Sequence, residues 1–339
     1  MDKPLYLVTG AAGFVGARFV ESCAQRGIEV ISVDKESYFR DRKEHAGVKF
    51  GEIVDRDELF DWLATGHRVA DLEAIVHLGA CSRTTEMDRE FLLRNNVRYS
   101  QHLWQFARAA EIPMIYASSA ATYGGGEQGY DDDEATMSRL RPLNPYGESK
   151  WLFDQWALME DGAGRRPAGW AGLKFFNVYG FGERHKVGMS SVVVQGFDQI
   201  GKEGEIRLFE SHKPGVANGH QQRDFIWVQD VVNVLHFCVE RALNDPTTRG
   251  IYNLGTGHAR TFLDLAKAVF AALGKPENIR FVPMPEALRE RYQYFTEAKM
   301  ERLRTLGYEA PFTSLEDGVA AYVKRLAQVT PVKAPKPRR

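Results

Sequence analysis

The chain has 339 residues, of which 44% are hydrophobic, and a formal net charge of −1. This length suffices for a full doubly wound domain and a smaller lobe around a second core. The near-neutral charge favours neither a nucleic-acid partner nor an anionic membrane surface. No apolar run approaches the roughly 20 residues that span a bilayer, and the first residues predict a strand rather than a signal peptide, so we expect a cytoplasmic protein. The cysteines (Cys23, Cys81 and Cys238) are scattered, which predicts neither a disulfide framework nor a structural metal site.

The N-terminal segment predicts a phosphate-binding turn. Residues 4–9 have the pattern of a buried strand, residues 14–25 have helical periodicity, and Gly10, Gly13 and Gly16 follow the strand at three-residue intervals. The glycines permit a tight turn, so a pyrophosphate can lie on the amides of the helix N-terminus. A second predicted strand, 29–33, ends in Asp34, where a Rossmann unit places its ribose-binding carboxylate. The segment therefore predicts dinucleotide binding.

The residues around Asp34 leave open whether this dinucleotide carries a 2′-phosphate. Asp34 favours a free pair of ribose hydroxyls. Lys35, Arg40, Arg42 and Lys43 follow it, and any of them could hold a phosphate by charge and hydrogen bonds. The alternative is that these basic side chains belong to an ordinary solvated loop.

Farther along, strands alternate with helices, which predicts an α/β fold with a doubly wound parallel sheet of the Rossmann type. Further strands are predicted at 48–50, 73–78, 112–118 and 169–176, and a long helix at about 88–110. The strand at 73–78 runs into the small-residue segment LGAC, where the backbone can approach a cofactor closely. Asn95 falls on the long helix and either reaches the cofactor or faces solvent.

The C-terminal part predicts a smaller α/β substrate lobe. Beyond about residue 178 the pattern loosens, with a polar loop at 212–222 and short helices near 261–273 and 314–328. We assign residues 1–177, with a contribution from about 224–255, to the Rossmann domain. Residues 178–223 and 256–328 are assigned to the lobe, and 329–339 to a disordered basic tail.

Tyr146, Lys150 and Ser119 predict the chemistry of a short-chain dehydrogenase. Residues four apart lie one above the other on a helix, so the Lys150 ammonium can sit near the Tyr146 phenol. A phenol titrates near 10, and the pKa must fall by about 2 to 3 units for a phenolate to form at neutral pH. The lysine charge and an oxidised nicotinamide both act in that direction. Ser119 would hydrogen-bond the same substrate oxygen. A chance Tyr-x-x-x-Lys pattern is the alternative.

Segments along nearly the whole chain resemble those of the ADP-glyceromanno-heptose 6-epimerases, which are extended short-chain dehydrogenases of the NAD-dependent epimerase/dehydratase family. They are TGAAGFVG, HLGACSRTTEMD, YASSAATYGG, PLNPYGESK, FFNVYG, GERHKVGM and RYQYFT. The resemblance implies an isomerase that interconverts ADP-D-glycero- and ADP-L-glycero-manno-heptose by transient oxidation at C6. It implies bound NADP, with NAD as a possible substitute, and a homo-oligomer, a pentamer in the family. The product is a precursor of the lipopolysaccharide inner core.

The resemblance also implies roles for individual residues. Tyr146 and Lys186 would be two acid/base groups for opposite faces of C6, while Lys150 holds the nicotinamide ribose and Ser119 assists at the reacting oxygen. Arg223 would clamp the diphosphate. The implied cofactor contacts are Gly10, Gly13, Phe14, Val15, Gly16, Asp34, Lys35, Leu78, Gly79, Ala80, Cys81, Ser82, Asn95, Lys150, Val178 and Lys186. The implied substrate contacts are Ser119, Asn177, Gly188, Gln195, Phe209, Glu210, Ser211, His212, Arg223 and Tyr292.

Rival functions share part of this pattern. Another sugar-nucleotide 4-epimerase or reductase would use the same serine, tyrosine and lysine. A 4,6-dehydratase needs a carboxylate pair after the strand-end serine, where this chain has Ala120 and Ala121. A non-catalytic dinucleotide-binding subunit is the remaining alternative, because a fold alone does not establish catalysis.

Overall fold

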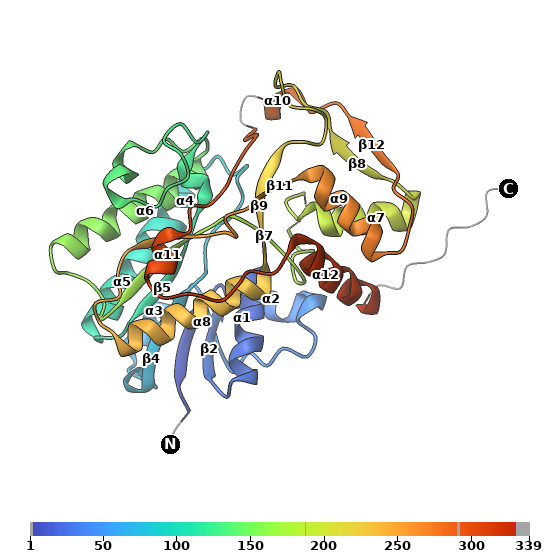
Figure 1. The fold of residues 1–339 in the computed structure, drawn as a ribbon. Coiled ribbons are helices and arrows are strands. Elements are labelled where there is room, and N and C mark those ends of the chain that lie inside the picture. The colour runs from blue at the N-terminus through green and yellow to red at the C-terminus, as the bar shows by residue number, and fades with distance from the viewer. Residues whose placement is uncertain (1–2, 187, 290–291, 330–339) are drawn as a thin grey trace. The chain divides into compact units, whose positions relative to one another are not determined.

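The computed structural model describes residues 3–186, 188–289 and 292–329. The chain forms two compact units, drawn in Figure 1. The first contains the residues up to Phe175, Val231–Leu254 and Lys299–Glu309, and the second contains Phe176–Asp230, Gly255–Ala298 and the residues from Ala310 onward. Lys299–Glu309, which the sequence assigned to the lobe, belongs to the first unit. Its Lys299 carbonyl accepts a hydrogen bond from Asn253 Nδ2 (2.9 Å), and its Arg302 pairs with Glu134 (2.6 Å).

The first unit is built on a parallel sheet, as the sequence predicts. Its seven strands, counted within the described residues, are ordered β10-β6-β5-β4-β1-β2-β3. They are β1 (Leu5–Thr9), β2 (Glu29–Asp34), β3 (Glu52–Asp55), β4 (Leu72–His77), β5 (Met114–Ser119), β6 (Trp170–Phe175) and β10 (Ile251–Leu254). The chain moves outward from β1 through β2 to β3 and then returns to β4 on the other side of β1. This makes the carboxyl ends of β1 and β4 the switch point at which such sheets bind ligands.

Two predicted elements differ from the structure. The strand predicted at 48–50 is wrong, because the extended ladder begins only at β3, at Glu52. Gly51 has φ +66°, and a Cβ on it would lie 2.2 Å from the Val30 carbonyl oxygen, so the chain turns there before it can pair with β2. The long helix predicted at about 88–110 consists of α4 (Arg89–Leu92), a π-helical turn η3 (Leu93–Arg98) and α5 (Tyr99–Ala109). The other predicted strands are confirmed to within two residues at each end.

An aromatic core fixes helix α6 against the sheet. Trp104 of α5 contacts Trp170 of β6 at 5.1 Å between ring centroids, and Phe153 of α6 contacts Tyr116 of β5 at 4.9 Å. Helix α6 (Pro145–Gly162) begins where Asn144 accepts a hydrogen bond from Gly147 N (2.8 Å). The other helices of this unit are α1 (Phe14–Gln25), α2 (Glu36–Asp41), α3 (Leu59–Ala64), most of α8 (Val228–Asn244) and α11 (Glu301–Thr305), with short turns η1 (Lys43–His45), η2 (Val69–Asp71), η4 (Ala120–Tyr123) and η5 (Glu134–Arg139).

The second unit is the smaller α/β lobe that the sequence predicts. One sheet pairs β7 (Asn177–Tyr179), β9 (Gln222–Trp227) and β11 (Ala259–Thr261), and another pairs β8 (Ile206–Phe209) with β12 (Ile279–Val282). Its helices are α7 (Val192–Glu203), α9 (Phe262–Ala272), α10 (Glu286–Arg289) and α12 (Leu315–Val329). A core including Phe197, Val269 and Tyr322 joins α7, α9 and α12. The helices predicted at 261–273 and 314–328 are confirmed.

The sequence also predicts a C-terminal tail and no membrane-spanning segment. Val329 ends α12, and residues 330–339 of the predicted tail lie outside the described residues. In the part of the chain that the structure describes, none of the helices has the length and apolar character needed to cross a membrane.

Candidate active site

The glycine turn after β1 packs tightly against the segment after β4. Gly10 has φ +66°, and a Cβ on it would lie 2.6 Å from Gly79 N. A Cβ on Gly16 would lie 2.1 Å from the Gly10 carbonyl oxygen. Gly13 caps α1, whose first turn contains no acidic residue. The amides at this helix end can therefore donate hydrogen bonds to a pyrophosphate, and the turn fits a dinucleotide. Phe14 is buried and Val15 half-buried at the start of the helix.

Asp34 is fixed at the edge of the same turn. Its carboxylate accepts hydrogen bonds from Ala12 N (3.1 Å) and Lys35 N (2.9 Å). Burial raises the pKa of Asp34, although these hydrogen bonds and the charge of Arg42 act to lower it. The carboxylate is thus held next to the turn, where a ribose would be recognised.

Arg42 is the basic residue that the structure places beside the turn. Its guanidinium donates to the Ala12 carbonyl and lies over the Tyr38 ring, 4.1 Å from the centroid. Arg40, in contrast, pairs with Glu36 on the exposed face of α2. The structure therefore distinguishes two of the four basic residues that the sequence left equivalent.

The segment after β4 contains Leu78, Gly79, Ala80, Cys81 and Ser82, and it is held from two sides. The Leu78 amide donates to the Thr9 carbonyl and the Gly79 amide to Thr9 Oγ1, both at 3.1 Å. Asn96 accepts a hydrogen bond from Cys81 N (2.8 Å) and donates to the Cys81 carbonyl (3.0 Å). These contacts set the backbone that a cofactor would meet.

Asn96, which the sequence did not single out, is the asparagine that holds the segment after β4. Asn95 donates to the Phe91 carbonyl one turn back (2.7 Å), while Asn96 also donates to Ser149 Oγ, between Tyr146 and Lys150 (3.0 Å). Both lie in the π-helical turn η3, which changes the face that each residue occupies. The sequence signal was the Asn-Asn pair, and an ideal helical register could not decide between its members.

Ser119, Tyr146 and Lys150 come together at the carboxyl end of β5. Ser119 ends that strand, and its hydroxyl accepts a hydrogen bond from Ala121 N (3.1 Å) and bonds the Tyr146 phenol. Tyr146 lies in the first turn of α6 and is 9% exposed. Lys150 donates from Nζ to the Ala117 carbonyl (2.8 Å).

The ionisation of this group differs from the sequence expectation. Burial raises the pKa of Tyr146 above its usual value, and the Ser119 hydrogen bond opposes this. Burial lowers the pKa of Lys150 to about 8, and the charge of Asp154 is the main influence that raises it. Burial therefore dominates in the protein alone, and the positive charge of an oxidised nicotinamide would oppose it at Tyr146.

In the second unit, Glu183 closes the loop that carries Lys186. The buried Glu183 carboxylate accepts hydrogen bonds from Ser191 N and Oγ (both 2.6 Å) and from Gly180 N (3.3 Å). Burial raises the pKa of Glu183, and the charge of Lys186 is one of the influences that lower it. Within the loop, the Lys186 amide donates to the Glu183 carbonyl (2.9 Å), and Gly188 has φ +75°.

Most of the predicted substrate residues gather around the ends of β8 and β9. Arg223 lies on β9, with its guanidinium over the Tyr292 ring at 5.1 Å. Gln221 Nε2 donates to the carbonyls of Phe209 (3.4 Å) and Glu210 (3.3 Å), so the end of β8 is tied to the start of β9.

Further hydrogen bonds complete this arrangement. The Ser211 amide donates to Asn218 Oδ1 (2.8 Å) and the His212 amide to the Tyr294 hydroxyl (2.9 Å). Of the remaining predicted residues, Gln195 donates to the Ser190 carbonyl (2.6 Å), and Asn177 and Val178 lie on β7.

The three cysteines have free thiols. Across residues 3–186, 188–289 and 292–329, no group of three or more histidine, cysteine, aspartate or glutamate side chains is arranged to hold a metal ion.

Comparison with known proteins relates this geometry to an enzyme family. The sequence pattern of the NAD dependent epimerase/dehydratase family matches residues 6–255. An ADP-L-glycero-D-manno-heptose-6-epimerase of Nitratidesulfovibrio vulgaris strain DP4 is 47% identical over 322 residues, which are 95% of this chain and 97% of that protein. One from Fusobacterium nucleatum is 44% identical over 333 residues, 94% of this chain and 97% of the relative. The crystal structure of a Helicobacter pylori protein of this name superposes with a TM-score of 0.76 at 25% identity and covers 96% of both chains.

Proposed function

Because this chain belongs to the NAD dependent epimerase/dehydratase family, we propose that it interconverts ADP-D-glycero-β-D-manno-heptose and ADP-L-glycero-β-D-manno-heptose at C6. A nicotinamide dinucleotide, when bound, supplies the hydride acceptor and donor. The observation that carries the proposal is the group of Ser119, Tyr146 and Lys150 at the carboxyl end of β5, in a chain that matches relatives of this activity over nearly its whole length.

The reaction inverts a carbon that bears no acidic hydrogen. Its hydroxyl loses a proton and its C–H bond loses a hydride, which leaves a ketone, and hydride and proton return from the other face. We assign the proton on one face to Tyr146 and on the other to Lys186, and the orientation of the reacting oxygen to Ser119. Lys150 would hold the nicotinamide ribose.

Arg223 would bind the diphosphate of the substrate. A guanidinium can bond two phosphate oxygens at once, and its stacking on Tyr292 restricts the side chain before the substrate arrives. The contacts of Gln221 to Phe209 and Glu210 support a nucleotide-binding surface at the same strand ends.

We propose NADP as the cofactor, with NAD binding more weakly. Arg42 is held at the turn through Ala12 and Tyr38, so its charge is in place for a 2′-phosphate beside Asp34. NADP should therefore be found by mass spectrometry of the nucleotide released on denaturation, and Arg42→Ala should weaken NADP binding more than NAD binding. Release of NAD alone, or an equal effect on both, would contradict this assignment.

The activity is tested by incubating the purified protein with each ADP-heptose epimer and following the other by NMR. Tyr146→Phe and Lys186→Met should each slow epimerisation by about 10²-fold or more. Tyr252→Phe is a matched control, because it removes the same atom from another buried tyrosine of the first unit, and Lys202→Met controls for loss of an exposed lysine in the second. Full activity of Lys186→Met would show that a single base serves both faces.

The rival functions give different results in the same assay. Turnover of uridine or guanosine diphosphate sugars without turnover of ADP-heptose would favour a 4-epimerase, and no turnover with retained cofactor would favour a non-catalytic subunit. The proposal also includes the cytoplasmic location and homo-oligomeric state expected from the sequence, which cell fractionation and light scattering would test.

A further inference from the structure

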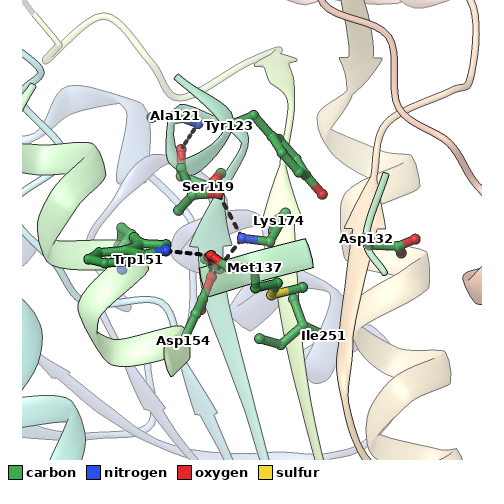
Figure 2. A network of polar contacts seen from close by, with 12 residues as sticks. Ser119, Ala121, Tyr123, Asp132, Met137, Trp151, Asp154, Lys174 and Ile251 are labelled. Carbon is green, nitrogen blue, oxygen red and sulfur yellow. Dashed lines mark hydrogen bonds and ion pairs between the residues drawn. The ribbon is translucent and has the colours of Figure 1, made fainter. Parts of the chain in front are cut away.

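A buried ion pair joins helix α6 to strand β6. Lys174 Nζ lies 2.8 Å from Asp154 Oδ2, and the two side chains are 0% and 1% exposed. Figure 2 shows Lys174 reaching toward Asp154, with Ser119 and the turn through Ala121 close by. Because removing two charges from water costs about as much as their attraction returns, such a pair is weak evidence for stability. Its position suggests a different role.

The pair holds Ser119 from both sides along the chain. Ser118 Oγ donates to Asp154 Oδ2 (2.7 Å), which anchors the residue before Ser119. Lys174 Nζ donates to Thr122 Oγ1 (2.7 Å), and Thr122 in turn donates to the Ser119 carbonyl (2.8 Å). The backbone at Ser119 is therefore held indirectly, through Ser118 to the anion and through Thr122 to the cation.

The same pair is attached to the helix that carries Tyr146 and Lys150. Asp154 follows Lys150 by four residues on α6, so the two side chains lie on one face of the helix. The second carboxylate oxygen is also occupied, because Tyr116 on β5 donates to Asp154 Oδ1 (3.0 Å). The pair thus connects the strand that ends in Ser119 with the helix that presents Tyr146.

We propose that Asp154 and Lys174 form a positioning pair for hydride transfer, which fixes Ser119 relative to Tyr146 and Lys150. This inference rests on the proposed function, in which Ser119, Tyr146 and Lys150 carry the chemistry. Neither Asp154 nor Lys174 touches the reacting atoms in this role; they act through the residues that do.

The charge of Asp154 also affects the ionisation of Lys150 and Tyr146. Burial lowers the pKa of Lys150 to about 8, and the charge of Asp154 raises it, so loss of that charge should lower the pKa further. The loss should also lower the pKa of Tyr146, which Asp154 raises. Titratable and charged groups around Lys150 are Tyr146 and Asp154 of α6, Lys174 of β6, Cys81 after β4, and His77 of β4, which burial keeps neutral.

The test uses the full chain with its cofactor and four variants. Asp154→Asn and Lys174→Met each leave one buried charge without its partner, and both should lower the melting temperature. The double variant Asp154→Asn/Lys174→Met has uncharged side chains of similar shape and should melt above either single variant. Its kcat for epimerisation should nevertheless remain about 10- to 100-fold below wild type, with KM and cofactor content little changed. The single variant Lys174→Arg, which keeps the charge and the hydrogen-bond donors, should be much more active than Lys174→Met.

Two readouts separate positioning from a merely structural role. The activity profile of Asp154→Asn should move to lower pH on both limbs, because this variant removes the charge that raises the pKa of Lys150 and Tyr146. The titration of Lys150 by ¹⁵N NMR in Asp154→Asn, assigned with Lys150→Met, should show a midpoint below that of wild type, and this measurement does not require turnover. A double variant that regains wild-type kcat together with its stability, or an unchanged Lys150 titration, would overturn the inference. A wild-type protein that retains this titration but turns over neither epimer would refute only the proposed function.

Discussion

Gly16→Ala should disrupt the cofactor turn without changing any group that contacts a ligand through its side chain. The added Cβ would lie 2.1 Å from the Gly10 carbonyl oxygen and 3.0 Å from Ala11 Cα. Real Cβ contacts essentially never fall below 3.0 Å, so helix α1 and the turn must separate by about 0.9 Å. Forced overpacking of this kind costs about 1 to 3 kcal/mol of unfolding free energy, and the better helix propensity of alanine returns up to about 1 kcal/mol.

Gly162→Ala provides the matched control. It is the same change in helix α6, with nothing within 4 Å of the new Cβ, and it should stabilise the protein slightly. The difference between the two variants in chemical denaturation therefore isolates the steric cost at the turn. Displacement of the amides should also weaken dinucleotide binding in Gly16→Ala by about 1.5 to 3 kcal/mol, the value of a hydrogen bond to a charged group. Calorimetric titration that found equal cofactor affinity and stability in both variants would refute this account of the turn.

Three further changes have expected results. Arg223→Ala should weaken ADP-heptose binding by about 1.5 to 3 kcal/mol in a calorimetric titration and leave cofactor binding unchanged; an unchanged substrate affinity would place the clamp elsewhere. Glu183→Gln places an amide NH2 against either Ser191 N or Gly180 N, which bond different oxygens of the carboxylate, so it should cost about 1 to 3 kcal/mol in denaturant unfolding and lower turnover through the Lys186 loop; wild-type values of both would contradict the role of Glu183. Burial lowers the pKa of His77 to about 3, so the unfolded chain takes up a proton that the folded chain does not as the pH falls from about 6.5 to 3. Wild type should therefore lose up to about 1.4 kcal/mol more stability per pH unit in that window than His77→Gln, and parallel stability curves would contradict this.

Local patterns predicted the cofactor half of the fold well. The order of glycine turn, strand and Asp34 depends on contacts within a few dozen residues, and the structure brings these residues together as expected. The prediction of a strand at 48–50 was wrong for a local reason. The left-handed turn at Gly51 follows Phe50, so pairing with β2 begins only beyond it. Hydrophobic content alone does not reveal where a chain turns.

Contacts between distant segments were beyond the sequence. In the sequence, nothing distinguishes Lys174 from other strand residues. Its partner Asp154 lies on helix α6, and the two meet only once β6 pairs with β5 and α6 packs on the sheet. In the same way, Arg42 could not be separated from its basic neighbours before the structure placed it over Tyr38. The expectation of a low pKa for Tyr146 rested on the neighbouring charges. It left out the burial of the phenol, which has the larger effect on this pKa in the protein alone.

The order in which the first unit is completed follows from its discontinuous chain. Strand β10 forms one edge of its sheet and pairs with β6, and Asn253 on that strand donates to the carbonyls of Tyr130 (2.8 Å) and Lys299 (2.9 Å). During synthesis the ribosome therefore releases Phe176–Asp230 of the second unit before the last strand of the first can dock. Most domains fold as they emerge, N-terminal part first. Here the edge of β6 stays unpaired until that intervening segment and β10 have been synthesised. A nascent chain that stalls between residues 176 and 250 would therefore expose the unpaired edge of β6 to aggregation.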